Sequence, residues 1–324
     1  MFNVKTIIGI ALLALGCSTT LLAQNEVTYQ ANLIKKIYSM GTASVNGTYY
    51  PVGNAISRLC SNKLKSLVTI AEPTAGSMAN VEYLRKKKIN LALMQSDVAW
   101  MAYHGSFTYS GNAFKELRVM ASLYSEKVQI VVKADSGIKT LSDLAGKKIA
   151  VGEKDSGSAA GAIQILEAAG LKQDAYELIY ERFTNSTESL LDGYIDALYY
   201  VGGVPADGLS RLAAKTPIRL LEIPAEVSKA LMEKFPYYSS EFIEAKSYNG
   251  QSDRVNSIGF KALLTCSEDT PTEEIISILS VIYSNPTIVN EQNETLVKLD
   301  REEALKGIDL EMLHKGASNF FSLH

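Results

Sequence analysis

Short apolar runs alternate with amphipathic stretches along most of this chain of 324 residues. The first runs predict strands over residues 68–71 and 89–94, and the stretches after them predict helices over residues 78–85 and through Trp100. The same pattern predicts further strands over residues 128–133, 148–152, 195–201, 218–223 and 257–266, and helices over residues 159–169, 272–283 and 301–313. Strands that alternate with helices imply parallel sheets, whose ligands bind beyond the carboxyl ends of the strands.

Polar loops rich in Gly, Ser and Thr follow several predicted strands. The first loop runs from Gly41 to Thr48, and a helical pattern with Val52, Ile56 and Cys60 on one face comes after it. Comparable loops occupy residues 72–77, 95–97, 153–158 and 202–205, with Ser77 expected at an N-cap. Such loops direct backbone N–H groups and hydroxyls toward one point at the positive end of a helix, which suits an anion. The alternative, that Gly and Ser only form the turns, stays open for each loop.

The length of 324 residues exceeds one typical core and predicts two lobes. Residues 126–222 are predicted to form one set of strand–helix units (lobe II), and residues 27–125 with 223–324 the other (lobe I). Strands near residues 126–132 and 218–224 are expected to join the lobes as a hinge. The stretch 235–253 is expected to be a surface excursion or a cover for a lobe.

The composition is that of an ordinary globular protein, with 47% hydrophobic and 21% charged residues. A net charge of −3 gives no reason to expect a nucleic acid partner. Residues 1–23 read as a secretory signal peptide, with Lys5 before an apolar core and cleavage expected after Ala23. Cleavage before Cys17 with lipid attachment is the alternative. Either way the protein is exported, and we expect a periplasmic location.

The two remaining cysteines, Cys60 and Cys266, both have apolar neighbours. We expect two buried free thiols, although an oxidising compartment permits a disulfide. The cysteine spacing does not fit a metal site. No metal or other cofactor is therefore expected.

Several motifs resemble those of the TAXI family, the extracytoplasmic solute receptors of TRAP transporters. They include Gly41-Thr42, residues 47–53, Ala75-Gly76-Ser77 and residues 95–99. The match continues through residues 117–124, 134–144 and 151–158, Gly202-Gly203-Val204-Pro205 and residues 217–221, and it covers about residues 37–285 in register. Members usually carry Gly-Gly where Ala43-Ser44 stand here, and the loop at residues 153–155 is unusually charged.

The resemblance implies an α/β, two-lobed periplasmic binding protein fold of type II, in which each lobe is a mainly parallel sheet flanked by helices. It also implies a monomer that captures a small organic acid, similar to glutamate, glutamine or 2-oxoglutarate, and delivers it to the permease subunits of a TRAP transporter. A ligand-sensing module for a membrane signalling protein is the alternative within the same fold.

The loops supply the candidate binding residues. We expect Ser44, Thr48 and Ser77 of lobe I to hold the carboxylate of the ligand through hydroxyls and nearby N–H groups. The residues expected to complete the site are Ser156, Gly157 and Ser158 from lobe II, Gln95 and Ser96 at the polar end of the ligand, and Tyr49 as a wall. For Ser77, Ser96 and Ser158 the rival interpretation is helix capping alone. Arg182 could reach a second carboxylate or lie solvated at an edge, and either Tyr199 or Tyr200 is expected to line the cleft.

A catalytic constellation is not evident. The loop at Gly152, Gly157 and Ser158 lacks the lysine of a phosphate-binding P-loop. The three histidines have neither nucleophile nor metal spacing. We therefore expect no enzyme, and an exported hydrolase with a hydroxyl nucleophile is the remaining alternative.

Overall fold

One ten-stranded mixed sheet runs the length of the computed structural model, which describes residues 35–45, 47–154, 156–289, 295–306 and 308–322. The main strand order is β2-β1-β3-β10-β4-β7-β5-β6, while β8 pairs with β4 and β9 pairs with β10. The strands are β1 (Lys36–Gly41), β2 (Leu67–Glu72), β3 (Leu91–Gln95), β4 (Leu117–Lys133), β5 (Lys148–Ala150), β6 (Glu177–Ile179), β7 (Ala197–Gly202), β8 (Ile218–Leu221), β9 (Ser239–Ile243) and β10 (Val255–Ser267). A separate hairpin joins β11 (Thr287–Val289) and β12 (Thr295–Lys298).

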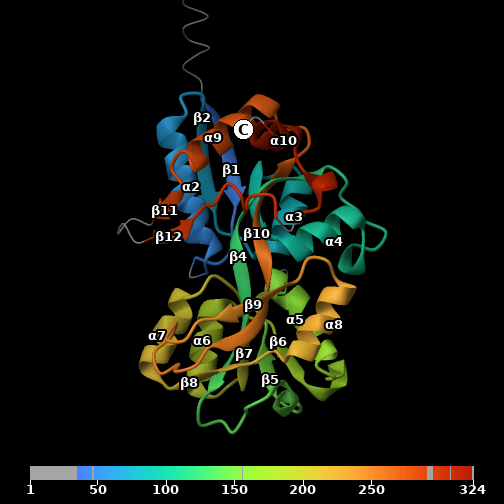
Figure 1. Cartoon of the computed structure of the whole chain (residues 1–324), viewed down its shortest axis with the longest axis vertical. Helices are drawn as coiled ribbons and strands as arrows, with labels where there is room; N and C mark the ends of the chain where they lie inside the picture. The colour runs from blue at the N-terminus through green and yellow to red at the C-terminus, as the bar shows by residue number, and fades with distance from the viewer. Residues whose placement is uncertain (1–34, 46, 155, 290–294, 307, 323–324) are drawn as a thin grey trace, which may run out of the picture.

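The sheet divides into two parallel triplets with antiparallel strands between them. Strands β2, β1 and β3 pair in parallel at one end, and β6, β5 and β7 pair in parallel at the other. Figure 1 shows the triplets in an upper and a lower half of the molecule, here called lobe I and lobe II. This arrangement confirms the predicted alternation of strands and helices.

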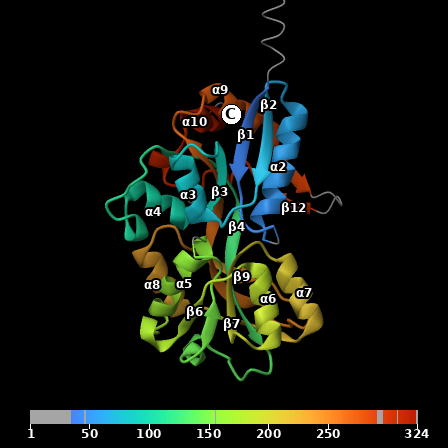
Figure 2. The ribbon, with the colours of Figure 1, turned by 180° about the vertical axis from the view of Figure 1, so that it is seen from behind.

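Helices cover both faces of each triplet, as Figures 1 and 2 show from opposite sides. Lobe I carries α2 (Tyr49–Lys63), α3 (Ser77–Arg85), α4 (Ser96–His104), α9 (Thr272–Tyr283) and α10 (Lys315–Ser322). Lobe II carries α5 (Gly157–Ala168), α6 (Phe183–Asp192), α7 (Asp207–Lys215) and α8 (Ala225–Lys234). Single 3-10 turns lie at η1 (Phe107–Tyr109), η2 (Leu141–Leu144), η3 (Gln173–Ala175) and η4 (Leu310–Met312).

The helices form where apolar spacing and end signals agree. Helix α2 buries Val52, Ile56 and Cys60 on one face, as the spacing predicts. The η2 turn is held by a capping box between Thr140 and Asp143. Four buried apolar clusters flank the sheet, two in each lobe.

Two long antiparallel strands, β4 and β10, pass between the lobes. The prediction that the strand near residues 218–224 forms the second hinge strand is wrong. Strand β8 pairs only with the last part of β4, at Ile130–Lys133, and stays within lobe II. The chain returns to lobe I along β10, about 40 residues later than the hinge prediction places it.

The segment after residue 222 therefore belongs with lobe II, in contrast to the predicted boundary. Val227 and Leu231 of α8 are buried in the same cluster as Ile165 of α5. Strand β9 pairs with β10 from Val255 to Gly259. The physical reason is that residues 235–253 bury four of their five aromatic side chains, as Tyr238 shows, so this stretch covers lobe II.

Three further local predictions have different outcomes. Residues 301–313 do not form the predicted helix, because the described part contains turns and η4 before α10 begins at Lys315. Cys60 and Cys266 are buried free thiols, as predicted. The signal peptide at residues 1–23 and the lipid alternative at Cys17 lie outside the described residues.

Among the described residues, no helix has both the length and the apolar character that a membrane span requires.

Candidate functional site

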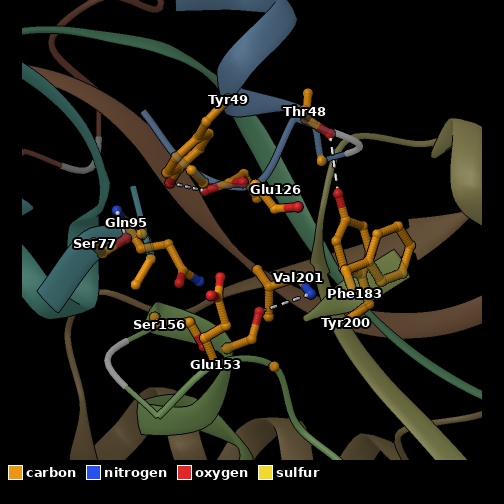
Figure 3. Close-up of a pocket in the computed structure, with 18 of the residues that line it drawn as sticks. Thr48, Tyr49, Ser77, Gln95, Glu126, Glu153, Ser156, Phe183, Tyr200 and Val201 are labelled. Atoms are coloured by element: carbon orange, nitrogen blue, oxygen red, sulfur yellow. Dashed lines mark hydrogen bonds between the residues drawn. The ribbon is translucent and has the colours of Figure 1, made fainter. Parts of the chain in front are cut away.

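A cavity lies between the lobes, at the carboxyl ends of strands from both parallel triplets (Figure 3). Its volume is about 80 Å³. One water needs about 10–15 Å³ by this kind of measure, so the space fits a small solute rather than a polymer. Parallel strands bring their following loops to one edge, which places loops that are distant in sequence around one cavity.

Eight of the nine predicted site residues line this cavity. They are Ser44, Thr48, Tyr49, Ser77, Gln95, Ser156, Gly157 and Ser158. The ninth, Ser96, does not: it borders a different depression beside Trp100 and Tyr237. Its hydroxyl accepts a hydrogen bond from the backbone N–H of Lys261 at 3.1 Å, because α4 begins with its first turn against β10.

The starts of three helices, α2, α3 and α5, meet at the cavity. Helices α3 and α5 come from different lobes and approach closely. A methyl group built on Gly76 would lie only 3.5 Å from Cα of Ser156. A methyl group on Gly157 would overlap the Gln95 side chain, at 1.5 Å from Oε1. Unpaired N–H groups at helix starts favour negative charge, so the part of the cavity beside the starts of α3 and α5 suits an anion.

The three serines at these helix starts have different partners. Only Ser156 caps its own helix, since its hydroxyl accepts from the N–H of Ala159 at 3.1 Å. The predicted N-cap at Ser77 is wrong, because α3 begins at Ser77 and Gly76 is the N-cap with φ of 114°. The Ser77 hydroxyl accepts from Gln95 N at 3.1 Å. The Ser158 hydroxyl accepts from Val201 N at 3.3 Å.

Thr48 connects the two lobes at the edge of the cavity. Its hydroxyl lies 3.2 Å from the hydroxyl of Tyr200 and accepts from the N–H of Gly203 at 3.2 Å. The ring of Tyr200 stacks on Phe183, with ring centroids 4.1 Å apart. Successive residues of β7 face opposite sides of the sheet, yet both Tyr199 and Tyr200 line the cavity because it lies at the end of the strand.

A buried carboxyl that the sequence interpretation missed, Glu126, also lines the cavity. Its Oε2 accepts a hydrogen bond from the Tyr49 hydroxyl at 2.5 Å (Figure 3). The pKa of Glu126 is raised to about 8, chiefly by burial; the Tyr49 hydrogen bond partly opposes the rise, and the negative charge of Asp97 adds to it. At neutral pH, Glu126 is therefore largely protonated when no cation is beside it.

A second acid, Glu153, lines the opposite side and accepts from Arg182 at 3.3 Å. The Arg182 side chain is 72% exposed and does not line the cavity. Lys154, the neighbouring cation, is exposed. The described cavity lining contains no Lys, Arg or His side chain. Within this described lining, N–H groups and hydroxyls are the donors available to an anion.

Asp97 lies behind the cavity at the start of α4 and is fully buried. Its Oδ1 accepts from the N–H of Val98 at 2.7 Å, whereas Oδ2 has no hydrogen-bond partner among the described residues. Burial raises the pKa of Asp97 to about 7, against the lowering effect of the backbone N–H groups. The Tyr199 hydroxyl is also buried without a described partner. Both groups lie beside Gly161 of α5: a methyl group built there would be 3.8 Å from Asp97 Oδ2 and 3.3 Å from the Tyr199 hydroxyl.

Other lining residues that the sequence interpretation missed include Phe183 and Ser186 of α6. The only sequence signal that could have identified them is their position: α6 follows strand β6 in the same way that α5 follows strand β5. Among the described residues, no cluster of three or more His, Cys, Asp or Glu side chains could hold a metal ion.

Comparison with known proteins gives a family and a fold. Residues 40–322 match the model of the NMT1-like family. A putative L-cystine ABC transporter protein from Listeria monocytogenes is 14% identical with a TM-score of 0.51, and the match covers 78% of this chain and 92% of that chain. The alkanesulfonate-binding protein SsuA from Xanthomonas axonopodis pv. citri, bound to MOPS, is 16% identical with a TM-score of 0.48, over 76% of this chain and 73% of that chain. The Listeria likeness shows the fold alone, and it confirms the predicted α/β fold of type II periplasmic binding proteins.

Proposed function

Because this chain belongs to the NMT1-like family and has a periplasmic binding protein fold, we propose that it is an extracytoplasmic solute receptor. In this proposal it captures a small carboxylate, similar to glutamate, glutamine or 2-oxoglutarate, between lobes I and II. The solute is bound and released without chemical change.

One observation carries the proposal: the starts of α3 and α5, from opposite lobes, meet at one small cavity. Ser44, Ser77, Ser156 and Ser158 line this cavity. A carboxylate placed there accepts several charge-assisted hydrogen bonds, each contributing roughly 1.5–3 kcal/mol. Four such bonds, after the cost of ordering the lobes, are enough for about micromolar affinity.

The lobes close around the ligand along β4 and β10 in this proposal. The crossings lie near Glu126 and Gly259, which is where we place the division between the lobes. Strands that cross between lobes absorb a hinge rotation while each triplet moves as a rigid body.

The function is tested by isothermal titration calorimetry and thermal shift with L-glutamate, L-glutamine and 2-oxoglutarate. A ligand at 100 times its dissociation constant stabilises the protein by about 2.7 kcal/mol. Ser44→Ala is expected to weaken binding, whereas Ser142→Ala, at an exposed serine of η2, is the matched control. A shift with glucose or putrescine but with no carboxylate would exclude an anion site. Turnover of the added acid would favour the hydrolase alternative.

We propose a TRAP-type permease as the partner, on the strength of the motifs at residues 41–53, 75–77 and 95–99. The likeness to an ABC transporter protein of Listeria makes an ABC permease the competing partner. Uptake in proteoliposomes separates them. A TRAP permease needs an ion gradient, whereas an ABC permease needs ATP.

A further inference from the structure

Glu126 sits where β4 crosses from lobe I to lobe II, and its side chain turns into the cavity (Figure 3). Only 2% of the residue is exposed. Among the described residues, the one hydrogen-bond partner of the Glu126 side chain is the Tyr49 hydroxyl. The nearby lysines are engaged elsewhere: Lys127 donates to Phe242 O at 2.6 Å, and Lys261 donates to the Ser125 hydroxyl at 3.0 Å.

Among the described residues, the groups around Glu126 carry no positive charge. Tyr49 of α2, Tyr124 of β4 and Tyr200 of β7 face it, and Asp97 of α4 adds negative charge. Burying a carboxyl without a cation is costly, and removing one partner of a buried ion pair is strongly destabilising. A carboxyl kept in this position needs a positive group, or a proton, to balance it.

The cavity therefore has two chemically different ends. Figure 3 shows Ser77, Gln95 and Ser156 on one side, where α3 and α5 begin, and Glu126 with Tyr49 on another. The Gln95 side-chain nitrogen, in a residue 4% exposed, is a buried donor without a partner among the described residues. Donors gather at the first end, where the Glu153 carboxylate is paired with Arg182, and a carboxyl without a cation lies at the second. This arrangement matches a ligand that carries both charges.

We propose that the Glu126 carboxylate binds an ammonium group of the solute while the starts of α3 and α5 hold its carboxylate. The solute class is then an amino acid, and an oxo diacid such as 2-oxoglutarate is a poor ligand. The inference rests on the proposed function, because it assumes that the cavity holds a carboxylate.

Binding of the ammonium group changes the protonation of Glu126. Before binding, the carboxyl carries a proton at neutral pH, and the incoming cation favours the ionised form. One proton leaves Glu126 for the solvent, and the ligand keeps its own three ammonium protons. Calorimetry at pH 7 in buffers of different ionisation enthalpy is expected to show release of between about half and one proton with L-glutamate, since a group of pKa about 8 is about 90% protonated at that pH. Release of less than a tenth of a proton by the wild-type protein would contradict the inference.

Affinity for matched ligand pairs gives a second test. L-glutamate and glutarate differ only by the amino group, as do L-aspartate and succinate. Wild-type protein is expected to bind the amino acid of at least one pair 10-fold or more tightly than its partner. Glu126→Gln keeps an acceptor for Tyr49. This variant is expected to bind the amino acid at least 10-fold more weakly than wild type and to bind the plain diacid with unchanged or higher affinity.

Glu153→Gln is the matched control, because Glu153 lines the same cavity beside the exposed Arg182. This control is expected to keep the wild-type preference for the amino acid. Equal binding of both members of each pair, or loss of the preference in Glu153→Gln but not in Glu126→Gln, overturns the inference and leaves the carboxylate receptor standing. Failure of every carboxylate to bind the wild-type protein overturns both.

Discussion

The hydroxyl oxygens of Thr48 and Tyr200 lie 3.2 Å apart and join the start of α2 in lobe I to β7 in lobe II. Thr48 also accepts from the backbone N–H of Gly203 in lobe II at 3.2 Å. Separation of the lobes would break both contacts. We therefore expect Thr48 to stabilise the closed form as a latch between the lobes, in addition to lining the cavity.

Replacing Thr48 by valine keeps the shape of the side chain and removes both contacts. Each neutral hydrogen bond contributes about 1 kcal/mol, so ligand affinity should fall about 30-fold through loss of the closed form. Calorimetry measures the affinity, and small-angle scattering measures closure on ligand addition. Thr48→Ser keeps the hydroxyl and should bind within about 3-fold of wild type. Wild-type affinity in Thr48→Val would show that the latch does not stabilise the closed form.

Gly157 is the second residue whose small size sets the contact between the lobes. A methyl group at this position would lie 1.5 Å from Oε1 of Gln95 and 3.0 Å from the Ser77 hydroxyl. Gly157→Ala is expected to force the Gln95 side chain aside and to weaken ligand binding 10-fold or more. The melting temperature without ligand should change by less than about 2 °C, since the lobes can separate to relieve the clash.

A double-mutant cycle tests the mechanism of this effect. In a Gln95→Ala background the clash partner is gone, so Gly157→Ala should cost little further affinity. Additive losses in the double variant would mean that Gly157 acts through another contact.

The parts of the fold that depend on local signals could be predicted from the sequence. The apolar spacing of α2 and the capping residues of η2 are encoded within single elements. The pairing of β10 with β3 and β4 is not, because the paired residues are more than 130 positions apart in the chain. The predicted hinge failed for that reason: β8 and β10 are both apolar strands, and only tertiary packing decides which one crosses.

The site follows the same division. Loops such as that of Ser156, at a helix start after a parallel strand, could be located because strand ends and helix caps have sequence signatures. Glu126 could not, because it lies inside a strand and nothing nearby in the sequence shows that its side faces a cavity. Ser96 has the expected sequence context, yet its hydroxyl accepts a hydrogen bond from a backbone N–H of β10 and does not line the cavity.

Replacing Ser77 and Ser158 tests whether their hydroxyls stabilise the fold as well as line the cavity. Each hydroxyl accepts from an N–H at the end of a strand, Gln95 N or Val201 N. Ser77 is 1% exposed, so Ser77→Ala leaves a buried N–H unsatisfied and should cost about 1–3 kcal/mol of unfolding free energy. Ser158 is less buried, and Ser158→Ala should cost less than Ser77→Ala. Urea denaturation without ligand measures both, and equal losses would contradict this ranking.

Asp97 is expected to make the stability of the protein depend on pH. Its folded-state pKa of about 7 lies well above its ordinary value of 3.8, because burial disfavours the charged form. The described groups around it offer no cation: its titratable neighbours are Tyr49, Tyr199, Tyr237, Tyr238 and Glu126. Between about pH 4 and pH 7 the folded protein holds a proton that the unfolded chain has released.

Unfolding free energy is therefore expected to fall as the pH rises from about 4 to about 7, because the unfolded state binds fewer protons over that range. A shift of about three pKa units limits the Asp97 contribution to about 4 kcal/mol. Asp97→Asn keeps an acceptor for Val98 N and cannot ionise, so urea denaturation should show a flatter pH profile and a variant more stable than wild type at pH 8. Asp192→Asn, at an exposed position in α6, should keep the wild-type slope. An unchanged slope in Asp97→Asn would mean that Asp97 ionises normally in the folded protein.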